Sequence, residues 1–140
     1  MTEMTHDEHV LTKASEDYLE AIYRLALEGA EGDGAVRSVD VAERLGVSKA
    51  SVNKALSTLK ESDMVEQSRY GRVTLTPRGR EYAALVWRAH RALRVFLESD
   101  LGVEAQRADE EACLMEHVLS EDTMGRLIAY LERQGLDIPE

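Results

Sequence analysis

The chain of 140 residues has a single cysteine, Cys113, and only two prolines. One cysteine cannot form a disulfide within the chain, and an unpaired thiol is typical of a reducing compartment. The sequence has no run of about 18 apolar residues, which a membrane-spanning helix needs. Its N-terminus also has no apolar segment of the kind found in signal peptides. We therefore expect a cytoplasmic protein with no membrane partner.

Aromatic residues make up only 5% of the sequence, and long runs of Val, Ile and Thr are few. This composition disfavours a β-sandwich and favours a mainly helical fold, for which a hydrophobic fraction of 44% is enough to form a core. The sequence also lacks a glycine-rich phosphate loop and a nucleophile elbow. We therefore expect no enzyme activity and no small organic substrate.

The charge of the chain is unevenly distributed. The net charge of −10 at first disfavours a nucleic-acid partner, because binding a polyanion relies on basic residues. Residues 37–80, however, contain nine basic and five acidic residues, a charge of +4, which leaves −14 for the remainder. This asymmetry is expected of one DNA-facing module in an otherwise acidic chain.

An N-terminal helix is expected over residues 12–28, with Ser15 as its cap and Gly29 as its stop. Leu19 and Ile22 recur there at helical spacing. After a glycine-rich acidic connector, residues 37–59 have the pattern of a helix-turn-helix. This segment would place the first turn of its second helix against DNA bases. The alternative is a plain helical hairpin with a solvated basic face.

In this helix-turn-helix, Ser38 is expected to cap a helix over residues 39–45, Gly46 to form the turn, and Ser48 to cap a second helix that ends at Leu59. Short polar side chains and lysines near the start of the second helix can reach base edges or phosphates. The DNA-binding candidates of this segment are Arg37, Ser48, Lys49, Ala50, Ser51, Asn53 and Lys54.

Residues 64–75 predict two short strands joined by a tight turn, which forms a wing after the recognition helix. Arg69 and Arg72 lie near the expected tip of the wing and complete the DNA-binding candidates. Thr76 and Pro77 are typical of a helix start, and the helix that follows is expected to end near Leu97. The sequence thus predicts a winged helix-turn-helix.

Residues 109–122 carry a second pattern. Cys113, Glu116 and His117 have the i, i+3, i+4 spacing that places side chains on one face of a helix. A thiolate, a carboxylate and an imidazole are all metal donors. The alternative is a buried free cysteine beside a surface Glu-His pair. The residues of this helix expected to face a core are Leu114, Val118 and Leu119.

Five separated motifs, taken in order, resemble the diphtheria toxin repressor and manganese transport regulator family. They are SEDYLEAIY (15–23), VAERLGVSKASV (41–52), LTPRGR (75–80), RAHR (88–91) and EACLMEHVLS (111–120). The resemblance extends from about residue 11 to residue 133. It implies a mainly α fold with a small β-hairpin wing, in which a helical metal-binding and dimerisation domain follows a winged helix-turn-helix DNA-binding domain.

The domains implied by the resemblance are residues 11–76 for DNA binding and residues 77–140 for metal binding and dimerisation. A flexible tail is expected over residues 1–10, and no C-terminal SH3-like domain is expected. The implied partners are double-stranded DNA with a palindromic operator and a second copy of the chain.

The same resemblance implies a set of metal ligands. Asp17 and Glu20 match ligand positions of the manganese branch, and His90, Cys113, Glu116 and His117 match ligand positions on the later helices. The implied cofactor is Mn(II) or Fe(II), while Zn(II) or Co(II) could also bind in vitro.

The chain departs from both branches of the family. The manganese branch has a carboxylate in place of Cys113, and the iron branch has a methionine in place of Asp17. Arg94 and Asp109 stand where the iron branch has a glutamate and a histidine of an ancillary site. An arginine cannot ligate a cation, which argues against that second site here.

The expected function is a transcriptional repressor of metal-uptake and metal-homeostasis genes, with the metal as corepressor. Three alternatives remain from the sequence. Cys113 could act as a redox sensor in a winged-helix regulator, the donors could belong to a metal-dependent hydrolase, or the chain could be a protein-interaction module.

Overall fold

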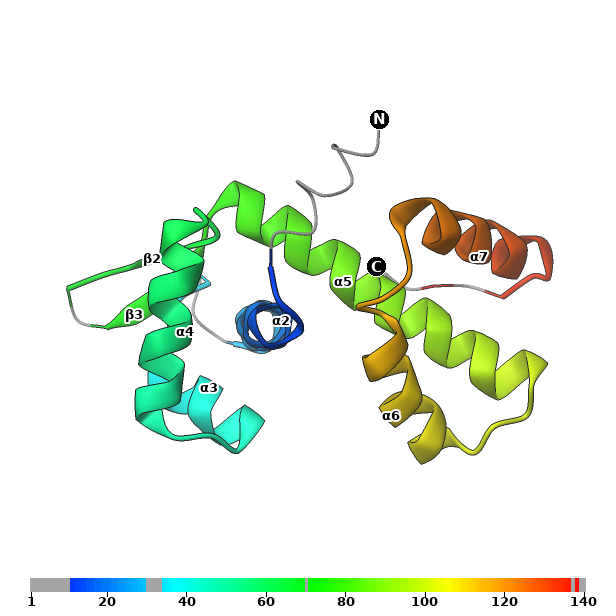
Figure 1. Cartoon of the computed structure of the whole chain (residues 1–140), viewed down its shortest axis with the longest axis horizontal. Helices are drawn as coiled ribbons and strands as arrows, with labels where there is room; N and C mark the ends of the chain where they lie inside the picture. The colour runs from blue at the N-terminus through cyan, green and yellow to red at the C-terminus, as the bar shows by residue number, and fades with distance from the viewer. Residues whose placement is uncertain (1–10, 30–33, 70, 137, 139–140) are drawn as a thin grey trace. The chain divides into compact units, whose positions relative to one another are not determined.

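A computed structural model of the chain describes residues 11–29, 34–69, 71–136 and 138. The tail predicted for residues 1–10 lies outside this range. The chain divides into two compact units, with the boundary between Ala84 and Leu85. The fold is mainly helical with one small antiparallel sheet (Figure 1), so the predicted fold class is confirmed. The described part of the chain contains no helix long and apolar enough to span a membrane.

The N-terminal unit packs three helices against the sheet. Its elements are α2 (Lys13–Glu28), β1 (Val36–Arg37), α3 (Ser38–Leu45), α4 (Lys49–Glu61), β2 (Val65–Gln67) and β3 (Arg72–Leu75). The core contains Ile22 of α2, Val41 of α3, Leu56 of α4 and Val73 of β3. Each of these residues is at most 1% exposed. Apolar residues at helical spacing therefore face one shared core, as the sequence pattern predicts.

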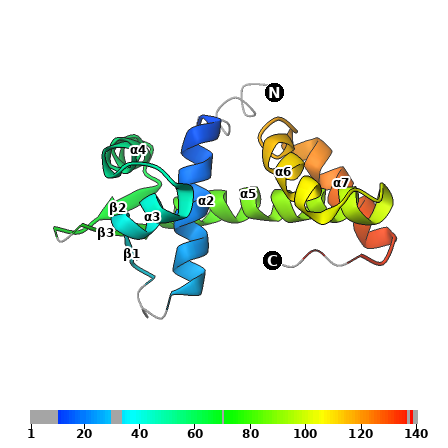
Figure 2. The ribbon, with the colours of Figure 1, turned by 90° about the horizontal axis from the view of Figure 1, so that it is seen from below.

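The sheet has three strands in the order β1-β3-β2, all antiparallel. The β2–β3 hairpin is the predicted wing, and it projects from the helices of its unit in both ribbon views (Figures 1 and 2). Strand β1 is absent from the sequence prediction. It is only two residues long and pairs Val36 with Val73 and Arg37 with Arg72, which is too short to leave an alternating pattern.

The helix-turn-helix forms with the predicted turn and second cap. Gly46 adopts the left-handed conformation at φ 67° that glycine tolerates best, and the Ser48 hydroxyl accepts a hydrogen bond from the amide of Ser51. Two predicted caps are wrong. Thr12, not Ser15, caps α2, and Ser38 is the first residue of α3 rather than its cap. At α2 two hydroxyl residues compete for one cap position, and the sequence does not rank them. At α3 the cap position falls to Arg37, whose side chain makes no capping hydrogen bond.

Helix α5 crosses the boundary between the units: its residues before Leu85 belong to the N-terminal unit and the rest to the C-terminal unit. Two further helices complete the C-terminal unit. Its elements are α5 (Pro77–Val95), the π-helical turn η1 (Phe96–Asp100), α6 (Ala105–Met115) and α7 (Glu121–Arg133). Alanines at the contacts, such as Ala92, Ala108 and Ala112, are fully buried and belong to one core with Leu93 and Leu131. Such small residues let helix backbones approach closely.

The helix predicted over residues 109–122 is shorter than expected. Helix α6 ends at Met115, Glu116 is its C-cap in a helical conformation, and His117 lies in the following turn. The expectation that Leu114 and Val118 face a core is wrong, because they are 60% and 77% exposed. Leu119 does pack against the core.

Gly79 provides a test of the packing at the start of α5. A Cβ at this position would lie 1.9 Å from the carbonyl oxygen of Met64, and that oxygen is held by the Thr76 amide at 3.0 Å. We expect Gly79→Ala to lower the free energy of unfolding by about 1–3 kcal/mol or more, measured by urea denaturation.

Gly125→Ala is the matched control. Gly125 lies inside α7, and a Cβ there meets no atom within 4 Å. This variant should be stabilised by roughly 0.5–1 kcal/mol, because alanine is the better helix former. Equal behaviour of the two variants would contradict the close contact at Met64.

Candidate functional site

Three potential metal ligands meet at the C-terminal end of α6. Cys113, Glu116 and His117 each offer a ligand atom, and these atoms lie within 4.8 Å of one another. Bonds from a divalent cation to sulfur or nitrogen are about 2.0–2.3 Å long, so donors on one ion lie at most roughly 4.6 Å apart. Small side-chain movements would therefore bring all three within bonding distance of one ion.

The Glu116 carboxylate tests whether these residues fit a cation. Its side chain is fully buried, and Oε2 is one of two buried side-chain polar atoms in the described part of the chain that lack a hydrogen-bond partner. His117 Nε2 lies 3.3 Å from Oε2. A buried carboxylate oxygen without a donor is costly, and a cation is the type of group that would compensate it. The donor set fits a metal ion.

His90 contacts this cluster through Glu116. On α5, its Nδ1 lies 2.8 Å from Glu116 Oε1 and its Nε2 lies 2.8 Å from Asp109 Oδ1. The ring stacks on Trp87, with centroids 5.5 Å apart and planes 9° apart. Arg94 Nη1 lies 3.7 Å from the same Asp109 oxygen. His90 therefore stands behind Glu116, between two carboxylates.

Arg94 brings a permanent positive charge to this side of α5. Its Nε donates to Glu98 Oε2 at 2.7 Å. That hydrogen bond raises the pKa of the guanidinium above its usual value. Burial partly opposes this rise, and the charges of Glu98 and Asp109 add to it. Arg94 is therefore always a cation and never a ligand.

The remaining predicted ligands, Asp17 and Glu20, belong to α2 of the N-terminal unit. Asp17 Oδ2 forms an ion pair with Lys13 Nζ at 3.0 Å, one helical turn away, and Glu20 is buried. Their participation in a metal site stays a prediction.

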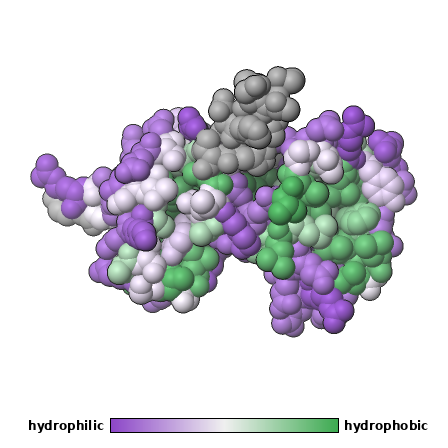
Figure 3. Space-filling model, in the orientation of Figure 1, coloured by the Kyte–Doolittle hydropathy of each residue, from purple (hydrophilic) through white to green (hydrophobic). Residues whose placement is uncertain are grey.

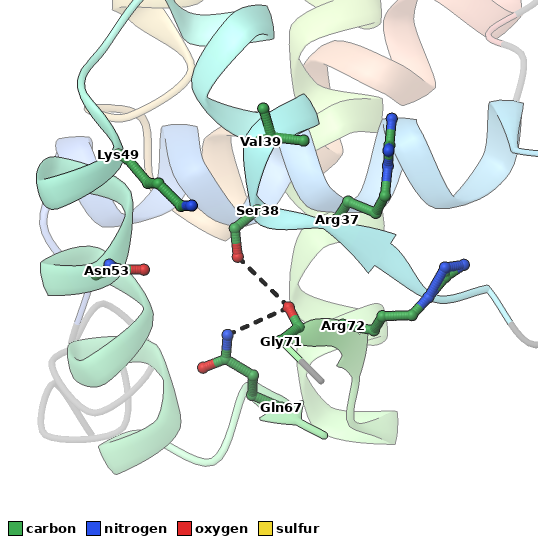
Figure 4. Close-up of a pocket in the computed structure, with 8 residues that line it drawn as sticks. All are labelled: Arg37, Ser38, Val39, Lys49, Asn53, Gln67, Gly71 and Arg72. Carbon is green, nitrogen blue, oxygen red and sulfur yellow. Dashed lines mark hydrogen bonds between the residues drawn. The ribbon is translucent and has the colours of Figure 1, made fainter. Parts of the chain in front are cut away.

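Some of the predicted DNA-binding residues come together at one pocket of the N-terminal unit. Four of them, Arg37, Lys49, Asn53 and Arg72, line an open pocket of about 430 Å³ between α4 and the wing. Lys49 and Asn53 point from α4 toward Ser38 and Gln67, and Arg37 and Arg72 extend away from α4 (Figure 4). The other predicted residues are exposed and do not line the pocket: Ser48, Ala50, Ser51, Lys54 and Arg69.

The pocket also contains residues that the sequence pattern did not single out for function. They are Ser38, Val39, Gln67 and Gly71. The Gly71 carbonyl accepts hydrogen bonds from Gln67 Nε2 at 3.3 Å and from Ser38 Oγ at 3.5 Å (Figure 4). These contacts tie the wing to the start of α3. Only the position of Ser38 beside Arg37 could have suggested this role from the sequence.

Two arginines are neighbours on adjacent strands of the sheet. Arg37 and Arg72 are directly paired in the β1–β3 register, and like charges in such pairs repel. Asp40 offsets one of them, because its carboxylate accepts two hydrogen bonds of 3.1 Å from the Arg37 guanidinium. The face retains an excess of positive charge, which suits a phosphate backbone.

Hydrophobic residues gather on the visible surface of the C-terminal unit (Figure 3). Among the described residues of this unit, the exposed large apolar ones are Leu85, Leu101, Leu114 and Val118. Contiguous apolar surface of this kind is typical of a protein interface.

Two family models match consecutive parts of the chain. The model described as the N-terminal DNA-binding domain of iron-dependent repressors matches residues 10–73, and the model described as their metal-binding and dimerisation domain matches residues 76–137. An uncharacterized HTH-type transcriptional regulator of Methanocaldococcus jannaschii is 30% identical over 123 residues, which are 88% of this chain and 96% of the relative. The chain belongs to the iron-dependent repressor family.

Two named branches of this family are among its relatives. The transcriptional regulator MntR of Salmonella typhimurium is 34% identical over 120 residues, covering 86% of this chain and 73% of the relative. The diphtheria toxin repressor of Corynebacterium glutamicum is 31% identical over 122 residues, or 87% of this chain. The chain spans about half of that repressor, with 52% covered. The predicted resemblance to the diphtheria toxin repressor and manganese regulator family is confirmed.

Solved structures of the family share the fold. A manganese-dependent transcriptional repressor in complex with manganese aligns with a TM-score of 0.73 and 35% identity, over 84% of this chain and 52% of that chain. The structure of the manganese regulator SloR gives the same TM-score at 30% identity. Relatives of this family are named as transcriptional regulators rather than enzymes.

Proposed function

We propose that the protein is a cytoplasmic, metal-dependent transcriptional repressor in which a divalent transition metal acts as corepressor. The observation that carries the proposal is the convergence of Cys113, Glu116 and His117, in which the buried Glu116 Oε2 has no hydrogen-bond partner. Membership of the iron-dependent repressor family supports the link between this site and DNA binding.

In this proposal Asp17 and Glu20 of α2 complete the ligand set. When bound, a divalent cation supplies positive charge and a fixed coordination geometry. Without that charge, the carboxylates of Asp17, Glu20 and Glu116 repel one another on approach. A ligand set drawn from two units therefore favours one arrangement of the DNA-binding unit over others.

The proposed DNA target is a palindromic operator upstream of genes for metal uptake or homeostasis. A two-fold dimer would place its recognition helices in successive major grooves, about 34 Å apart. The exposed apolar residues of the C-terminal unit support dimerisation through that unit. A modest change in the angle between the two DNA-binding units would then change operator affinity.

We propose Mn(II) or Fe(II) as the physiological ion, with Zn(II) or Co(II) able to bind in vitro. Carboxylates and imidazole suit Mn(II) and Fe(II), while the Cys113 thiolate increases the affinity for Zn(II). Solved relatives include a complex with manganese and a complex of ScaR with Zn2+. Cellular selectivity depends on geometry and availability more than on raw affinity.

The central test is metal-dependent capture of genomic DNA. Metal-stripped protein is mixed with upstream fragments from its own genome in Mn(II), anaerobic Fe(II), Zn(II) or chelator alone. We expect a few fragments to be retained only with metal. A Glu116→Gln, His117→Ala protein should lose this retention, whereas an Asp122→Asn protein, changed at an exposed ion pair of α7, should keep it.

Other outcomes identify the competing functions. Equal retention with chelator, abolished by peroxide, would replace the proposal with a redox regulator that uses Cys113. Hydrolysis of an ester or phosphoester by the metal-loaded protein, without DNA retention, would indicate a hydrolase.

The thiol of Cys113 gives an independent measure of metal binding. Cys113 is the single cysteine of the chain and is partly exposed, so an alkylating reagent should modify it in the metal-stripped protein. Because the thiolate is the reactive form of cysteine and a coordinated thiolate is a poorer nucleophile than an uncoordinated one, we expect saturating Zn(II) to slow alkylation. Mass spectrometry over time measures the rate. An unchanged rate in metal-saturated protein would remove Cys113 from the ligand set.

The pocket between α4 and the wing gives a prediction for DNA binding. Lys49→Ala and Arg72→Ala should each weaken binding to a retained fragment and reduce the slope of log affinity against log salt by about 0.9, the value for one phosphate contact. Arg126→Ala, which removes the same charge from α7, should leave the slope unchanged. Fluorescence anisotropy at several salt concentrations measures the slope. Equal slopes for the three variants would refute the assignment of Lys49 and Arg72 to phosphate contacts.

A further inference from the structure

His90 has no ring nitrogen left for a metal ion. An imidazole offers one position at Nδ1 and one at Nε2, and each lies 2.8 Å from a carboxylate oxygen, of Glu116 and of Asp109 respectively. The ring is only 6% exposed. His90 could ligate an ion only by giving up one of these two contacts.

The plane of the ring is also fixed. Trp87, one helical turn before His90 on α5, stacks on it with planes 9° apart. The Arg91 guanidinium lies 5.2 Å from the centre of the Trp87 ring. Rotation of His90 toward the cluster at Cys113 would therefore break a ring stack as well as two polar contacts.

The two oxygens of the Glu116 carboxylate have different surroundings. Oε1 is held by His90 Nδ1, while Oε2 has no hydrogen-bond partner and lies 3.3 Å from His117 Nε2. One oxygen is thus anchored and the other is available at the cluster. A histidine that anchors a ligating carboxylate fixes its orientation without touching the ion.

On the side of His90 away from Glu116, the positively charged Arg94 lies close to Asp109. Arg94 Nη1 lies 3.7 Å from the Asp109 oxygen that contacts His90 Nε2. A second metal ion on that side would meet the positive guanidinium at short range, and the two would repel. The polar groups run in the order Arg94, Asp109, His90, Glu116, with the metal cluster at one end only.

We propose that His90 is a positioning residue for Glu116 rather than a metal ligand, and that Asp109 and Arg94 hold His90 in place. Each subunit then binds a single ion, at the site of Cys113, Glu116 and His117 that Asp17 and Glu20 complete in the proposed function. This inference rests on the metal site of the proposed function. It changes the role implied for His90 by the family resemblance and takes Asp109, which ligates nothing, as a determinant of metal affinity.

The first readout counts the histidines on the ion. Mn(II) is added to full-length protein with 15N-labelled histidine, and pulsed electron paramagnetic resonance records the nitrogens coupled to the ion, with stoichiometry from equilibrium dialysis. We expect a single coupled histidine nitrogen and one ion per subunit. His90→Asn should leave the coupled nitrogen in place, whereas His117→Ala should remove it.

The second readout is Mn(II) affinity in two variants that remove the same charge from α6. Asp109 is about half exposed, so Asp109→Asn should fold, as circular dichroism can verify. Losing a direct partner of a ligand usually costs about 10- to 100-fold in metal affinity. Asp109 acts one contact further away, through His90, so we expect Asp109→Asn to weaken Mn(II) binding by roughly tenfold, the lower end of that range. Glu110→Gln, at the next exposed acid, should leave the affinity unchanged.

Two replacements of His90 distinguish a role in positioning Glu116 from a role in packing alone. Asn at position 90 retains an amide donor near the place of Nδ1, whereas Phe retains the stack on Trp87 but offers no donor. Mn(II) affinity should therefore fall less in His90→Asn than in His90→Phe. Equal losses would contradict a role that acts through the hydrogen bond to Glu116.

The outcomes distinguish this inference from the proposed function. A wild-type protein that binds no Mn(II) would remove the metal site altogether. Mn(II) binding with two coupled histidine nitrogens or two ions per subunit would keep the metal-dependent function and overturn the role of His90. Equal affinities of the Asp109→Asn and Glu110→Gln proteins would overturn it as well.

Discussion

The fully buried carboxylate of Glu116 is the constraint on which the C-terminal unit depends. Burying an ionised carboxylate is costly unless its oxygens find positive or donating partners. His90 Nδ1 contacts Oε1 of this carboxylate, whereas Oε2 has no hydrogen-bond partner and lies in the cluster with His117 and Cys113. The core of this unit supports that arrangement, because alanines such as Ala108 and Ala112 allow close packing of the helices that carry these groups.

Charge separates the two tasks of the chain. The chain as a whole is acidic, yet Lys49, Arg37 and Arg72 meet at one pocket of the N-terminal unit. The pairing of Arg37 with Arg72 across the sheet is unfavourable in isolation. It becomes useful when a polyanion lies on that face, because bound phosphates supply the missing negative charge. The metal cluster has the opposite character and gathers thiolate and carboxylate for a cation.

Local signals in the sequence were enough for most of the fold. The turn at Gly46, the cap at Ser48 and the wing all follow from short-range residue preferences, and the structure has them. Strand β1 could not be predicted, since its pairing with β3 joins residues that are 35 and 37 positions apart in the sequence. The same holds for Leu114 and Val118: helical spacing indicates a shared face, but not whether a core lies there. The spacing of Cys113, Glu116 and His117 did predict their convergence, although helix α6 ends before the last two.

The environment of His90 lies beyond any spacing rule, because it joins α5 to α6 through Asp109 and Glu116. A motif can place a histidine at a ligand position, but coordination needs a nitrogen that nothing else holds. Arg94 alters this balance from outside the cluster. By neutralising Asp109 it removes negative charge that would otherwise attract a second ion, and it leaves His90 bound to its two carboxylates. Selectivity then rests on one mixed donor set, in which a soft thiolate and hard carboxylates must accept the same ion.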